Sequence, residues 1–126
     1  MAKQITIKKA YVPIDFVDDD GNIIESFRFD KSDDAAQRII DVQNSVSASF
    51  AKAENDEDYS LDKLHVDLGK AVDSLLGEGS YEKLYDMSPS WEIMLHYFVA
   101  ICTSIAEETN TNLSEMNNAI DKYTKK

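Results

Sequence analysis

Residues 11–29 read YVPIDFVDDDGNIIESFRF, and this stretch decides the fold class. Apolar side chains alternate with polar ones before an Asp-rich turn, as at Ile14 and Phe16, and again after it, as at Phe27 and Phe29. Alternation with a period of two is typical of a β-strand with one buried face. The Asp-Gly pair of the turn supplies the residue types that tolerate positive φ. The pattern therefore predicts a β-hairpin.

Upstream of this stretch, Ile5 and Ile7 also alternate with polar residues, so we expect residues 1–30 to be strand and turn. The alternation changes phase near Ala10, as it would at a β-bulge. Pro13 has no N–H for a ladder, which favours an edge position or a bulge. Because an isolated hairpin is marginal in water, it must pack on helices, join another chain, or both.

Downstream, the period changes to three to four, and residues 32–126 are predicted to form four to five helices. Ser32 or Asp33 is the expected N-cap of the first helix, and an acidic linker is expected at 53–60. A second helix carries a leucine stripe, and Gly77 is the expected C-cap of that helix. The fold class is thus α+β, with one domain over residues 1–126.

After Gly77, residues 80–86 suit a short helix. We expect Ser88 to cap the next helix with Pro89 at its first position, where the missing N–H costs nothing. That helix carries Trp91 and Phe98, and the Asn-rich segment after it is expected to break it before a last amphipathic helix.

Charge excludes several classes of function. The chain has 24 acidic and 13 basic residues, a formal net charge of -11. Such a surface repels the phosphates of nucleic acids and anionic lipids, so neither is an expected partner. There is no apolar stretch of the length needed to span a bilayer, and residues 1–6 lack the apolar run of a signal peptide. The single cysteine, Cys102, is interpreted as a small core residue.

Motifs for catalysis or metal binding are also lacking. If Gly21 is placed at position six of a calcium loop, Phe16 and Phe27 occupy positions that need oxygen ligands. His65 and His96 have no second ligand at metal-binding spacing and are interpreted as helix-surface residues. We therefore expect no cofactor and no enzymatic activity.

Residues 75–85 read LLGEGSYEKLY. From the residues alone, Gly77 and Gly79 predict a joint between two helices that needs positive φ. The segment also resembles a recurrent motif of the tail assembly chaperones of long-tailed phages and prophages of Gram-positive hosts. The part that carries the resemblance is Gly77, Glu78, Gly79, Ser80 and Tyr81. The preceding hairpin and the Pro-started helix match the pattern of that family, from about residue 11 to residue 108.

The resemblance implies a protein that binds the long, helical tape measure protein, keeps it soluble and assists the tail-tube protein in assembling around it. It implies action in the bacterial host cytoplasm, absence from the mature virion, and self-association. An alternative is another phage or mobile-element module that binds protein, such as a connector component or an acidic inhibitor. An inhibitor that mimics nucleic acid should carry regular rows of carboxylates, whereas those of this chain form local clusters.

Candidate partner-binding residues come from the hairpin face and from the aromatic helix. Amphipathic helices bind in grooves through spaced apolar contacts, so exposed aromatic and aliphatic side chains are the first candidates. For Trp91 and Phe98 a place in the core is the favoured interpretation, which makes the hairpin the better candidate for partner binding. The full candidate set is Tyr11, Ile14, Phe16, Phe27, Phe29, Trp91 and Tyr97.

Overall fold

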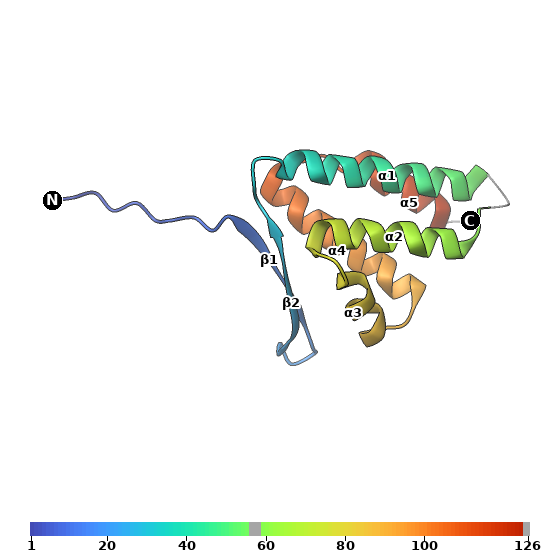
Figure 1. Ribbon diagram of the computed structural model, residues 1–126, viewed down its shortest axis with the longest axis horizontal. Helices are drawn as coiled ribbons and strands as arrows, with labels where there is room; N and C mark the ends of the chain where they lie inside the picture. The colour runs from blue at the N-terminus through green and yellow to red at the C-terminus, as the bar shows by residue number, and fades with distance from the viewer. Residues whose placement is uncertain (56–58, 125–126) are drawn as a thin grey trace.

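The computed structural model describes residues 1–55 and 59–124. In this described part an antiparallel hairpin is followed by five helices, which gives the α+β fold expected from the sequence (Figure 1). The strands are β1 (Tyr11–Val17) and β2 (Ile23–Asp30). The helices are α1 (Ala35–Asn55), α2 (Leu61–Leu76), α3 (Ser80–Met87), α4 (Trp91–Thr109) and α5 (Ser114–Thr124).

The hairpin has the register that its alternation requires. Val12 pairs with Phe29 and Ile14 with Phe27, so the apolar side chains share one face. Gly21 has a φ of 84° in the turn. The register shift lies between Phe16 and Val17, and the bulge expected near Ala10 is therefore misplaced.

The expectation of strand at Ile5 and Ile7 is wrong. Strand β1 begins only at Tyr11, and the residues before it form an extended N-terminal arm (residues 1–9) that leads away from the helices (Figure 1). The physical reason is the end of β2. Tyr11 lies opposite Asp30, the last residue of β2, so the arm has no facing strand to complete a ladder.

Helix α1 lies against both α2 and α5, and the hairpin packs on α2 and α4. The core contains most of the apolar residues that the helical periodicity predicts, including Phe50, Leu68, Phe98 and Cys102, each no more than 1 % exposed. Asn110 ends α4 in the left-handed conformation, with a φ of 57°, as its position in the sequence indicates.

Two helix boundaries differ from those expected. Helix α1 continues to Asn55, so residues 53–55 of the predicted acidic linker are helical, and 56–58 lie outside the described residues. Helix α4 begins at Trp91 with Ser90 as its N-cap, because the Ser90 side chain accepts a hydrogen bond from the N–H of Ile93 at 3.4 Å. Ser88 instead ends α3, and Pro89 precedes the cap.

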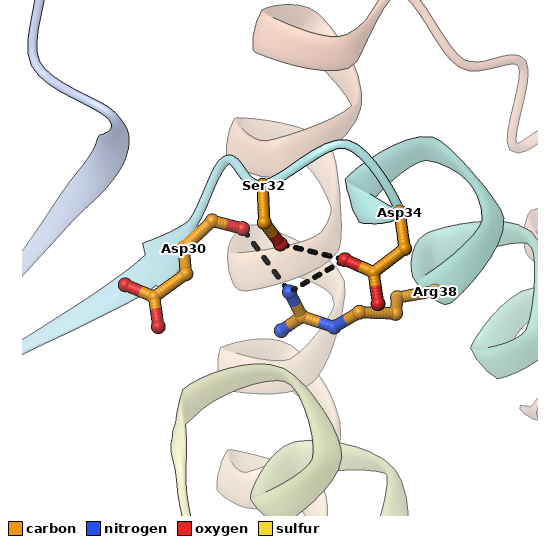
Figure 2. A network of polar contacts seen from close by, with 4 residues as sticks. All are labelled: Asp30, Ser32, Asp34 and Arg38. Carbon is orange, nitrogen blue, oxygen red and sulfur yellow. Dashed lines mark hydrogen bonds and ion pairs between the residues drawn. The ribbon is translucent and has the colours of Figure 1, made fainter.

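The junction between β2 and α1 fixes the hairpin on the bundle (Figure 2). The Arg38 Nη1 atom donates to the carbonyl oxygen of Asp30 at 3.1 Å and lies 3.9 Å from Asp34 Oδ1. The Ser32 hydroxyl donates to the same Asp34 oxygen at 2.6 Å. The Ser32 side chain therefore contacts Asp34, and because α1 begins at Ala35, neither Ser32 nor Asp33 occupies the N-cap position expected for it.

None of the helices in the described ranges combines the length and the apolar character that crossing a bilayer requires.

Candidate functional site

A groove of about 840 Å³ lies between α4 and α5, and we call it the α4–α5 groove. On α4, Trp91, Leu95 and Val99 recur every four residues and so lie on one face of the helix. The complete lining is Trp91, Glu92, Leu95, His96, Val99, Ala100, Ile120, Asp121, Tyr123 and Thr124. The groove thus combines an apolar floor with polar and acidic side chains.

The floor of the groove is supported from inside the bundle by one aromatic ring. Phe50 of α1 is 1 % exposed and stacks on Trp91 with ring centroids 6.4 Å apart. The same ring meets Tyr123 edge to face at 5.3 Å. The imidazole ring of His65 on α2 also contacts the indole, with ring centroids 4.7 Å apart. Because both aromatic lining residues rest on buried or half-buried rings, the groove is preformed.

Acidic and neutral polar groups, without a lysine or arginine, accompany the apolar lining. Glu92 and His96 are exposed residues of α4, and Asp121 is an exposed residue of α5. Carboxylates beside an apolar groove favour an occupant that carries basic residues at the margin of its apolar face.

The hairpin candidates lie mostly at a half-buried seam on α4. Phe16 meets Phe27 edge to face at 5.7 Å and Tyr97 at 5.0 Å. The Tyr97 hydroxyl is 2.9 Å from the Ser88 hydroxyl. These half-buried rings hold the hairpin on the bundle. Ile14 and Tyr11 are half-buried as well.

Phe29 is a correction to the candidate set. Its side chain is 0 % exposed, and the Arg38 guanidinium lies 4.5 Å from the centre of its ring. The alternation of the strand placed Phe29 on the same face as Phe27. At its position next to α1, however, that face is covered, so Phe29 belongs to the core and offers no surface to a partner.

The Gly77–Tyr81 segment forms the helix joint that the glycines predict. Gly77 and Gly79 have φ of 110° and 87°, which other residues rarely adopt. The Ser80 hydroxyl donates to the Gly77 carbonyl oxygen at 2.7 Å, and the Tyr81 N–H donates to Asp73 Oδ1 at 3.0 Å.

Tyr81 continues this joint into the bundle. Its hydroxyl lies 3.1 Å from His65 Nδ1, and a Cβ at Gly69 would come within 3.1 Å of its ring. Burial raises the pKa of Tyr81 to about 12, so the phenol stays protonated. These contacts indicate that Tyr81 stabilises the packing of α3 on α2.

The same joint faces the hairpin across a second hollow of about 520 Å³. Tyr11 and Phe27 of the hairpin line it together with Gly77, Glu78 and Ser80. The predicted site residues therefore fall in separate places. The joint lies near the hairpin, whereas Trp91 lines the α4–α5 groove.

One partly buried polar cluster joins the end of α1 to α2. The Asp67 carboxylate accepts hydrogen bonds from the Tyr59 hydroxyl and, at 2.8 Å, from the Ser49 hydroxyl. Burial raises the pKa of Asp67, but these hydrogen bonds outweigh it and hold the pKa below its ordinary value. Burial, followed by the bond to Asp67, raises the pKa of Tyr59. The groups satisfy one another and leave no reactive side chain.

No group of three His, Cys, Asp or Glu side chains that could hold a metal ion occurs within 1–55 and 59–124. His65 is half-buried among Tyr81, Tyr85 and Trp91, and His96 is exposed on α4. The described residues thus bring together surfaces for binding, without a cluster suited to metal chemistry.

Sequence reasoning missed the α4–α5 groove as a surface. The sequence of α4 contained a signal for it. Met94, Phe98 and Ile101 form one apolar stripe, and Leu95 and Val99 form a second apolar stripe beside it. A helix that is apolar around most of its circumference needs more covering than one neighbour provides. In comparisons with known proteins, no family model, curated protein or solved structure matches the chain.

Proposed function

We propose that this chain is a phage tail assembly chaperone that binds the tape measure protein and keeps it soluble during tail assembly. The motif at Gly77–Tyr81 suggests the family, and the observation that carries the proposal is the α4–α5 groove. A preformed apolar groove with carboxylates beside it is the kind of surface that accepts an amphipathic helix.

The chemistry of the groove defines the segment it would bind. Trp91, Val99 and Tyr123 offer half-buried apolar contacts, so the bound helix should place apolar side chains at a spacing of three to four residues. Glu92 and Asp121 would pair with lysine or arginine flanking those contacts. The net charge of -11 would keep the complex with an apolar client in solution.

The proposed mechanism is reversible binding without a chemical step. The chaperone covers the apolar stripe of the tape measure protein in the host cytoplasm and leaves when tail-tube subunits replace it. It is therefore not a part of the finished virion.

The test is co-expression with the tape measure protein encoded beside this chain, followed by affinity capture and a solubility assay. Ala100 and Ala48 form a matched pair, because both are exposed alanines inside helices and only Ala100 lines the groove. The variant Ala100→Asp places a charge at the groove, whereas Ala48→Asp adds the same charge on α1.

We expect Ala100→Asp to weaken capture of the tape measure protein about tenfold or more, the loss typical of one interface contact. Ala48→Asp should bind as the parent does. Equal capture by both variants would exclude the groove as the binding site. If the parent itself neither captures the tape measure protein nor keeps it soluble, the chaperone function is wrong.

A further inference from the structure

The N-terminal arm is the least covered part of the described chain. All of its residues are exposed, and the side chains of Ile5 and Ile7 are 87 % and 88 % exposed. An aliphatic side chain left this open lacks the favourable free energy that burial from water would give it. The arm has an extended backbone and apolar side chains with a period of two, as a β-strand does, but no strand of the described residues pairs with it.

Exposed apolar residues also gather at the turn end of the hairpin. Val17, Ile23 and Ile24 are 55 %, 61 % and 55 % exposed. The sheet has only two strands in the described residues, so each strand has one edge without a neighbouring strand. A two-stranded sheet gains stability when a third strand joins it.

Charge makes the arm and the hairpin complementary. The arm contains Lys3, Lys8 and Lys9 and no acidic residue. Residues 11–30 contain six acidic residues and one basic residue, a net charge of -5. Within a chain whose total is -11, the basic arm is attracted to the hairpin of any copy it meets.

The hydrogen-bond pattern selects one edge of the hairpin. Lys31 N–H donates to the Ala10 carbonyl oxygen at 2.8 Å, which makes this a hydrogen-bonded pair and fixes the alternation along the ladder. The backbone groups of Pro13 therefore point away from β2, where proline offers no N–H. That edge of β1 is a poor acceptor for another strand.

On β2, the backbone N–H and carbonyl groups of Ser26 and Arg28 point away from β1 by the same alternation. Both residues are exposed. Further along, the Asp30 carbonyl is already bonded to Arg38 (Figure 2), which leaves the groups of Ser26 and Arg28, nearer the turn. Both residues also line the hollow of about 520 Å³ that faces the Gly77–Tyr81 segment, so a strand added here would enter that hollow.

We propose that the N-terminal arm of one copy of this chain adds as a third strand to the outer edge of β2 in a second copy. The arm leaves its own hairpin from β1, on the side opposite to that edge, which makes pairing between copies the direct arrangement. Mutual exchange of arms closes a two-fold dimer. This inference is independent of the groove and of the proposed client.

The first experiment compares the full chain with a variant lacking residues 2–9 by sedimentation velocity over a range of concentrations. We expect the full chain to self-associate and the shortened chain to be monomeric. Higher salt should weaken the association, because the arm and the hairpin carry opposite charges. A full chain that stays monomeric, or a shortened chain that associates equally, overturns the proposal.

Point variants separate the apolar face of the arm from its charge. Ile5→Asp with Ile7→Asp should shift the association constant at least tenfold, while Gln4→Asp with Thr6→Asp, which changes the charge by the same amount, should shift it less. Equal effects of the two pairs would contradict an arm that pairs as a strand with one apolar face.

Hydrogen exchange locates the contact without changing the hairpin. When a peptide of residues 1–10 is added to the shortened chain, the amides of Ser26 and Arg28 should exchange more slowly, since the arm would accept hydrogen bonds from them. Protection confined to residues elsewhere, such as those of the α4–α5 groove, would overturn the assignment of this edge.

Discussion

The helical bundle and the N-terminal segment use apolar residues in opposite ways. The largest fully buried side chains come from the helices with the single exception of Phe29. In contrast, Ile5, Ile7, Val17, Ile23 and Ile24 of the first 24 residues are all more than half exposed. The bundle covers most of its apolar side chains within the chain and leaves those of the α4–α5 groove partly open, whereas the arm and the hairpin turn leave theirs largely uncovered. The difference teaches that the segment we propose for self-association lies outside the helices that supply most of the core.

The largest effect that would test this division is a cavity in the bundle. Phe50→Ala removes a ring that is 1 % exposed and supports both Trp91 and Tyr123, so we expect the free energy of unfolding to fall by about 3–5 kcal/mol. Phe16→Ala, at the half-buried hairpin seam, should cost only about 1–2 kcal/mol. Urea unfolding measures both. Equal losses would mean that the hairpin is as much a part of the core as α1.

A smaller effect is expected in the pH dependence of the free energy of unfolding, through Asp67 of the bundle. The pKa of Asp67 is lowered in the folded state, so its contribution is complete above the unfolded value of about 3.9 and is lost as pH falls through the folded pKa. Asp67→Asn should cost about 1–3 kcal/mol at pH 7, because hydrogen bonds from Tyr59 and Ser49 are weakened. At a pH below both values, the variant and the parent should unfold with similar free energies in urea.

In the hairpin, Asp18 is also a carboxyl group whose pKa is lowered in the folded state. The backbone N–H of Asn22 lowers the pKa of this carboxyl group, but the group is fully exposed in the turn. Asp18→Asn should therefore change the urea midpoint less than Asp67→Asn does at pH 7. A larger change for Asp18 would show that turn formation limits the stability of the whole chain.

The smallest expected effect on the structure comes from measuring how fast cysteine side chains react with a thiol reagent. Burial raises the pKa of Cys102 to about 12, and the side chain is 0 % exposed, so a thiol reagent at pH 8 should react only as fast as the bundle opens. A cysteine placed in the arm, as in Thr6→Cys, should react at the rate of a free thiol at low protein concentration. Rapid labelling of Cys102 in the folded parent would contradict a tightly packed α4.

Much of the fold follows from local patterns in the sequence. Alternation around the Asp-Gly turn predicted the hairpin, and the leucine spacing predicted α2 up to its end at Gly77. These features depend on contacts between near neighbours, such as a cap or a turn that needs positive φ. The boundaries at Ser88 and Asn55 were misjudged because more than one nearby residue could serve as a cap or a break.

The sequence by itself determined the α+β class, the helix joint at Gly77 and Gly79, and the acidic character of the surface. Only the tertiary structure decided which apolar residues are covered. It placed Phe29 in the core, left Ile5 and Ile7 open, and set Val99 and Tyr123 on the two sides of one groove. The physical reason is that periodicity gives each residue a face on its own element, while burial depends on which other element packs against that face.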